Sequence, residues 1–85
     1  MMNVNDWVWK VDGAERICRN EEHQVSVRIE DDGDISRGKL LDCPMELFGE
    51  IAKIPGGEKI IEEIVSSAVR AYTLDSVYRE ISPAR

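Results

Sequence analysis

The side chains best suited to nucleophilic chemistry are two cysteines, Cys18 and Cys43, and one histidine, His23. A cysteine attacks as its thiolate, so it needs a neighbouring base or a setting that lowers its pKa. His23 lies in a polar Asn-Glu-Glu-His turn and is expected to face solvent, and nothing in the sequence brings it beside either thiol. Cys43 stands at the expected start of a helix, where the helix dipole favours the thiolate. Cys43 is therefore the candidate reactive thiol, although two inert, reduced cysteines are the simpler interpretation.

Carboxylates are concentrated in residues 30–34, which read Glu-Asp-Asp-Gly-Asp. Clustered carboxylates favour hard cations such as Ca²⁺. The run lacks both the regular Asp-x-Asp-x-Asp-Gly spacing and the distal glutamate of an EF-hand loop, so an acidic hairpin turn is the simpler explanation. We expect no metal and no cofactor here, and the turn stays a candidate contact for a basic partner.

Residues 54–59, Ile-Pro-Gly-Gly-Glu-Lys, precede a helix in the way that some phosphate-binding loops do. The segment lacks the spacing of a P-loop, does not follow a predicted strand, and places Glu58 where an anion would bind. It is interpreted as an interhelical turn. Since no catalytic signature stands out, we expect a protein that is not an enzyme.

Trp7, Trp9 and Arg16 form another candidate group, because aromatic rings beside arginine on a sheet can stack nucleic-acid bases. All three fall on the apolar face of the predicted sheet, and the net charge of -6 repels a phosphate chain. We therefore expect the rings in the core and no nucleic-acid partner. The same residues could line a pocket between the sheet and the helices. That pocket defines the alternative function, a small-ligand-binding protein or a minor enzyme.

The elements that would position these residues follow from hydrophobic periodicity, which changes from two to 3.6 near Leu41. This pattern predicts one α+β domain over residues 1–85 with two layers. An antiparallel meander of three to four strands at about 5–41 is followed by two helices, at about 43–54 and 58–81, packed on one face. A change of phase in the apolar stripe near residues 73–75 predicts a bend or a restart of the second helix. Gly49 is expected to mark a close contact of the first helix.

The strand register is predicted from the turn signals. Asp12-Gly13 favours a two-residue hairpin turn, and a second turn is expected at residues 20–23. The predicted partners are Val11 with Ala14, Cys18 with Val25, and Val27 with Gly38.

The helix expected from residue 58 has an apolar arc distinctly wider than the roughly 100° that one core layer covers. In a chain of 85 residues the simplest additional cover is a second copy. We therefore predict a homodimer that acts as a binding or regulatory module through protein contacts. The residues predicted for self-association are Ile60, Ile64, Val65, Ala68, Val69 and Tyr72.

The composition, 42% hydrophobic and 33% charged, is that of an ordinary globular protein. The sequence holds no apolar run long enough for a membrane span, and its first residues lack the features of a secretion signal. Two isolated cysteines are too few for a disulfide scaffold. We therefore expect a cytoplasmic protein without membrane association, and no motif set in it is specific enough to indicate a family.

Overall fold

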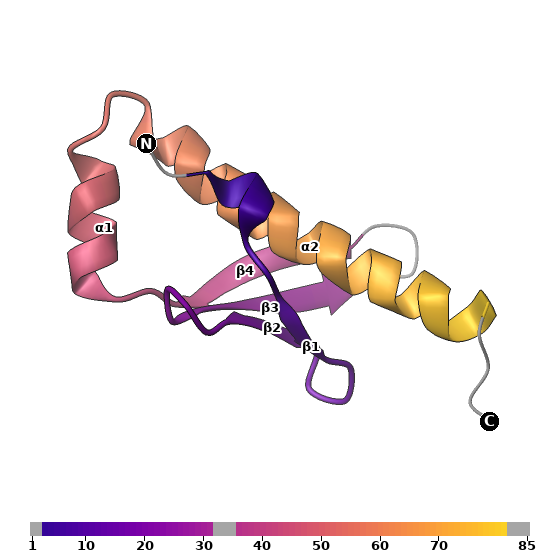
Figure 1. Ribbon diagram of the computed structural model, residues 1–85. Coiled ribbons are helices and arrows are strands. Elements are labelled where there is room, and N and C mark those ends of the chain that lie inside the picture. The colour runs from indigo at the N-terminus through magenta and orange to yellow at the C-terminus, as the bar shows by residue number, and fades with distance from the viewer. Residues whose placement is uncertain (1–2, 32–35, 82–85) are drawn as a thin grey trace.

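The chain folds into a four-stranded sheet with a long C-terminal helix lying on one of its faces, and a shorter helix packs against that long helix beyond the end of the sheet (Figure 1). The computed structural model describes residues 3–31 and 36–81. The strands pair in sequence order as an antiparallel meander, so the predicted α+β class is confirmed. In chain order the elements are η1 (Val4–Asp6, a 3-10 helix), β1 (Lys10–Asp12), β2 (Ile17–Asn20), β3 (Val25–Asp31), β4 (Ser36–Asp42), α1 (Met45–Ala52) and α2 (Gly57–Ile81).

The strand register differs from the predicted one at every pairing, yet the predicted face is the buried one. Cys18 lies opposite Val11 and Val27, and Val27 lies opposite Leu40. Each partner has moved by two or four residues, and an even shift keeps every side chain on its face because side chains alternate with a period of two. The prediction of which side chains are buried is therefore correct, although the predicted strand partners are wrong.

The length of the first turn and the position of the second explain the shifts of the first two pairings. Residues 13–16 form a four-residue turn instead of the two-residue turn predicted at Asp12-Gly13, and the second turn lies at residues 21–24, one residue later than predicted. The Asp12 carboxylate accepts hydrogen bonds from the N–H groups of Ala14 and Glu15, at 3.1 and 3.2 Å, and holds the longer turn. The prediction of a tight hairpin was therefore wrong, because a local side-chain contact outweighed the Asp-Gly signal.

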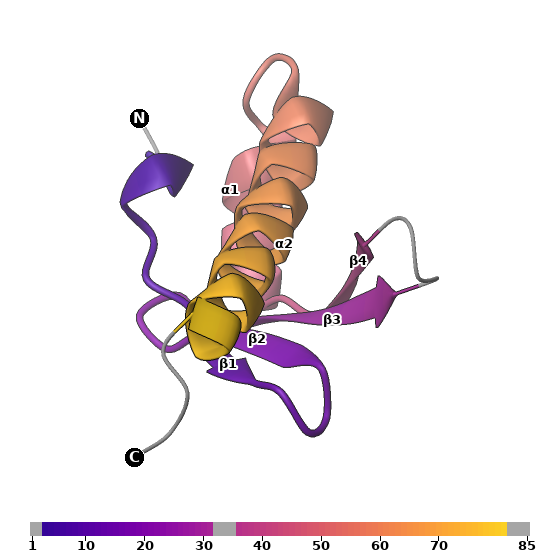
Figure 2. The ribbon, with the colours of Figure 1, turned by 90° about the vertical axis from the view of Figure 1, so that its right-hand side faces the viewer.

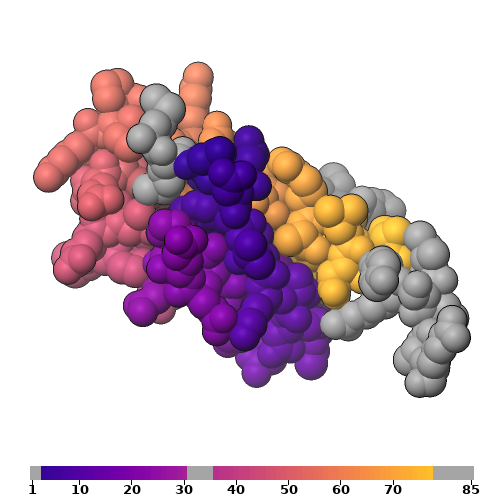
Figure 3. All heavy atoms as spheres, in the orientation of Figure 1, coloured from indigo at the N-terminus to yellow at the C-terminus, as the bar shows by residue number. Residues whose placement is uncertain are grey.

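The N-terminal segment is mostly not a strand, which corrects the prediction of a strand from about residue 5. Residues 4–6 form η1, capped by the Asn3 side chain, and β1 starts only at Lys10. The segment between them crosses toward α2, and Figure 3 shows the N-terminal residues lying against that helix.

The core lies between the sheet and α2 (Figure 2). The inward side chains of β3, Val25, Val27 and Ile29, are at most 1% exposed, and they pack under Ile64 and Ala68 of α2. α2 continues as one helix through residues 73–75, so the predicted restart does not occur.

Gly38 in β4 lets α2 approach the sheet closely. A Cβ atom at this position would lie 2.5 Å from Cγ1 of Val65 and 2.9 Å from Cγ2 of Val69. Gly49, where a close contact was predicted, has no atom within 4 Å of its Cβ position, so that prediction was wrong. The glycine that the packing requires is therefore in the strand.

Cys18 lies at the centre of the core. Its Sγ donates toward the Ala68 carbonyl oxygen at 3.5 Å, and no part of the residue is exposed. Burial, and secondarily the charge of Asp75, raises the pKa of this thiol from 9.0 to about 11. Cys18 is therefore a structural residue rather than a nucleophile.

Replacement of Gly38 tests the approach of α2 to β4. Gly38→Ala adds a methyl group against two stiff, β-branched valines, so we expect the free energy of unfolding to fall by about 1–3 kcal/mol. Gly49→Ala is the matched control, because the same methyl group enters open space within a helix and should raise the free energy of unfolding by up to about 1 kcal/mol. Urea denaturation measures both changes. A Gly38→Ala variant as stable as the parent would contradict this packing.

The raised pKa of the buried Cys18 thiol predicts a loss of stability at alkaline pH. Above pH 9.0 the unfolded chain releases the thiol proton while the folded chain keeps it up to about pH 11, so rising pH favours unfolding. The loss attributable to Cys18 is at most about 2–3 kcal/mol across this interval, and the thiol adds no pH dependence below it. Denaturant melts of the parent and of Cys18→Ala provide the test, because other groups titrate equally in both. Equal slopes of stability against pH in the two proteins would refute the assignment.

Candidate functional site

The two tryptophans pack on the helix side of the sheet. Trp7 belongs to the buried core, and the half-buried Trp9 donates from Nε1 to Oγ of Ser67 on α2 at 2.9 Å. Their ring centroids are 5.8 Å apart, with planes tilted by 44°. Trp7 is therefore a core residue, and Trp9 packs against the core on the apolar side of the sheet.

His23 was expected to face solvent, but its side chain is only 31% exposed. Its ring stacks on Trp7, with centroids 4.4 Å apart and planes within 19°. Its Nε2 atom lies 3.7 Å from a carboxylate oxygen of the exposed Glu22. Neither cysteine is among these contacts, so the structure gives His23 a packing role.

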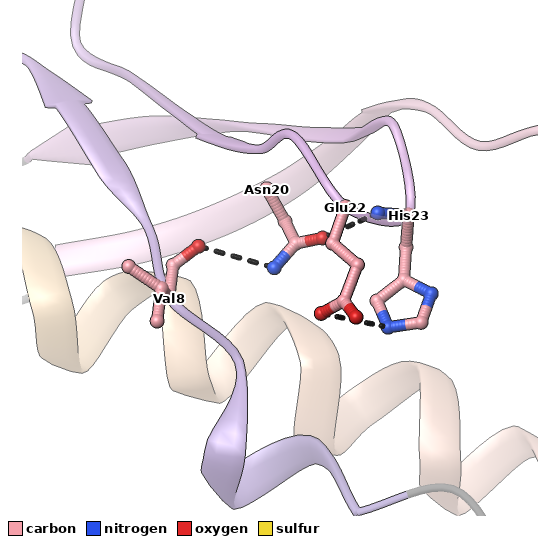
Figure 4. Close-up of polar contacts among 4 residues, drawn as sticks. All are labelled: Val8, Asn20, Glu22 and His23. Carbon is pink, nitrogen blue, oxygen red and sulfur yellow. Dashed lines mark hydrogen bonds and ion pairs between the residues drawn. The ribbon is translucent and has the colours of Figure 1, made fainter.

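Asn20 links the N-terminal segment at Val8 to the turn that contains His23 (Figure 4). Its side chain is 2% exposed, donates from Nδ2 to the Val8 carbonyl oxygen at 3.1 Å, and accepts from the His23 N–H at 2.7 Å. A buried amide with both ends satisfied fixes its neighbours firmly. Asn20 therefore fastens the N-terminal segment to the turn of residues 21–24.

Arg16 lies apart from the tryptophans. It is exposed, ends the turn of residues 13–16 with φ 57, and accepts from the Ile29 N–H through its carbonyl oxygen at 2.7 Å. Asn20, which holds the tryptophan segment, lies four residues further along the chain, a distance of about 13 Å in an extended strand. The contacts of Trp7, Trp9 and Arg16 thus do not converge on one space, and a ligand pocket built from them stays a prediction.

Cys43 does not sit in the setting of a reactive thiol. α1 begins at Met45 with Pro44 as its N-cap, so Cys43 precedes the first turn of the helix. Partial burial, and secondarily the charge of Asp42, raises the pKa of the Cys43 thiol. Because a raised pKa reduces the thiolate, the reactive thiol considered at this position is not supported. Both cysteines are free.

The six α2 residues predicted for self-association divide into two groups. Ile64 and Ala68 are completely buried within the subunit. The other four pack against the core but are only half-buried, and these are Ile60, Val65, Val69 and Tyr72. Any contact through this helix must therefore use its flanks, because its central apolar stripe is already covered.

One flank of α2 adjoins the free edge of the sheet. Among the described strands β4 pairs only with β3, so the outer edge of this seven-residue strand has no partner in the described part of the chain. Its inward residues Ser36, Gly38 and Leu40 are half-buried, unlike those of β3. Val65 and Val69 lie directly over Gly38, and Tyr72 follows on the same side of the helix. We call β4 with these three α2 side chains the β4 edge surface.

Sequence reasoning missed the β4 half of this surface. The meander prediction contained the necessary signal, because the last strand of a meander lies at an edge. It did not show that the inward residues of this strand would be incompletely covered.

A second apolar area lies on α1. Met45 is 89% exposed and Phe48 54% exposed, and Phe48 borders a hollow of about 260 Å³ between α1 and the start of α2. Ile54 and Ile61 contribute to its lining. The hollow is small and largely apolar, without the convergent polar groups that orient a specific ligand.

Two further sequence predictions concern metal and membrane. Within residues 3–31 and 36–81 no group of three His, Cys, Asp or Glu side chains is placed to hold a metal ion. Residues 32–34 of the acidic run lie outside the described residues. Among the described helices, none has the combination of length and apolar character needed to cross a bilayer.

The geometry thus offers surfaces for contact rather than a set of converging catalytic groups in the described part of the chain. Comparison with protein-family models, with curated proteins and with solved structures found no match to this chain.

Proposed function

We propose that this chain is a small cytoplasmic homodimer that acts as a binding or regulatory module through protein contacts, and that its dimer forms along the β4 edge surface. The observation that carries the proposal is the seven-residue edge strand lying beside half-buried apolar side chains of α2.

An unpaired strand edge attracts another chain. Its N–H and C=O groups can form a ladder with a second strand, and natural proteins usually cover or interrupt long edges. β4 is seven residues long, whereas the opposite edge strand β1 has three. The longer edge therefore has the greater capacity for pairing.

The apolar side chains beside this edge add the hydrophobic part of the contact. Val65, Val69, Tyr72 and Leu40 keep part of their surface exposed within one subunit. A second copy related by a two-fold axis would bring the same side chains against these, as in other isologous interfaces. Burial of that surface would also stabilise a chain of only 85 residues.

Light scattering of the purified chain at micromolar concentration tests the dimer. We expect a mass of twice the 9.7 kDa of the single chain. Val69→Glu should reduce the mass to that of the monomer, because it buries an unpaired charge at the contact. Ser66→Glu is the matched control, because it places the same charge on the exposed polar stripe of α2 and should leave the dimer intact.

Tyr72→Glu provides a second variant, further from Gly38, and circular dichroism checks that each variant keeps its helix content. A monomer mass for the parent chain at every accessible concentration would refute the dimer. A dimer that survives both Val69→Glu and Tyr72→Glu would refute its location.

A further inference from the structure

The face of the sheet opposite the helices is rich in positive charge. Cys18, Val27 and Gly38 point toward α2, so the residues alternating with them point away, toward the face that no described helix covers (Figure 2). This open face carries five cationic side chains and three carboxylates in a chain whose net charge is -6. The cations are Lys10, Arg19, Arg28, Arg37 and Lys39, and the carboxylates are Asp12, Glu30 and Asp42.

Cations face each other directly across two strand pairs. Lys10 lies opposite Arg19, and Arg28 lies opposite Lys39. Like charges at directly opposite positions destabilise a sheet. These opposed cations therefore make the sheet less stable than neutral side chains at the same positions would.

Carboxylates of the chain itself relieve part of this charge, because Glu30 lies directly opposite Arg37. Lys10 pairs with Glu21 at 3.1 Å, and both side chains are largely exposed. Within the described residues, no ion pair joins Arg19, Arg28, Arg37 or Lys39 to a carboxylate. All four of these side chains are exposed and available to an anionic partner.

We propose that this open face binds an acidic segment of a partner protein, rich in Asp and Glu. Guanidinium groups pair with carboxylates through two parallel hydrogen bonds, and three arginines here present such groups. The proposal deepens the protein-contact role proposed above and rests on it, but it does not require the dimer.

Nucleic acid fits this face less well than an acidic peptide. The four strands contain no aromatic side chain on which a base could stack. A long phosphate chain would also reach the acidic remainder of a molecule with net charge -6, whereas a short peptide can remain on the basic face.

Fluorescence anisotropy of a labelled octapeptide of alternating Asp and Glu, titrated with the full chain, tests the proposal. We expect saturable binding that weakens several-fold when salt rises from about 20 mM to about 200 mM, because salt screens exposed charges. A neutral octapeptide of alternating Asn and Gln should not bind.

Paired substitutions locate the binding. The double variant Arg28→Glu with Lys39→Glu should weaken peptide binding at least about tenfold. The matched control, Lys59→Glu with Arg70→Glu, changes the net charge equally on the exposed side of α2 and should alter affinity less than about twofold. Arg28→Gln with Lys39→Gln removes the opposed charges without adding new ones, so it should stay folded and still bind more weakly than the parent.

Three results would overturn the proposal. One is the absence of peptide binding at low salt, and another is an equal loss in the sheet and α2 double variants. The third is tighter binding of a thymidine octanucleotide than of the acidic peptide, which would assign the face to nucleic acid. Light scattering measures the mass of the chain without peptide, so a failure of peptide binding is distinguishable from a failure of the dimer.

Discussion

The close contact of α2 with β4 at Gly38 is the constraint on which the remaining structure depends. Because this strand position has no side chain, Val65 and Val69 can lie directly on the backbone of β4. At that depth Ile64 and Ala68 cover β2 and β3, and the Ala68 carbonyl oxygen meets the Cys18 thiol. Core packing is sensitive to a single methyl group, so a larger residue at this position would lift the helix from the sheet.

One helix is too narrow to cover this sheet, and the parts of the sheet on either side of α2 are covered to different degrees. Four strands about 4.8 Å apart span about 14 Å between the outer strand axes, whereas a helix with its side chains is about 10–12 Å across. On the β1 side the N-terminal segment fills the gap, with Trp9 bonded to Ser67 and Trp7 held beside His23. On the β4 side no described segment has that role, which is why the half-buried side chains of the β4 edge surface collect there.

Hydrophobic periodicity was enough to predict the fold class and the buried face. Both depend on the alternation of side chains along each strand and not on which residues are partners across neighbouring strands. The strand partners depend on the length and position of each turn, and the two turns end at Arg16 and Gln24 with positive φ, a conformation that those residue types do not signal. The wide apolar arc of α2 was also visible in the sequence. The sequence did not show which part of that arc the sheet would bury, because the burial of Ala68 and the partial exposure of Val69 arise only from the tertiary arrangement.

The two proposed surfaces meet on β4, so their functions would be physically coupled. Two copies paired along this strand would bring Arg37 and Lys39 of one chain near the same cations of the other, and like charges across a strand pair oppose association. An acidic segment lying on the open face would neutralise those cations and remove part of that repulsion. By linkage, a ligand that favours the dimer binds the dimer more tightly than the monomer. The basic face would thus make self-association responsive to the acidic partner, which is the behaviour expected of a regulatory module.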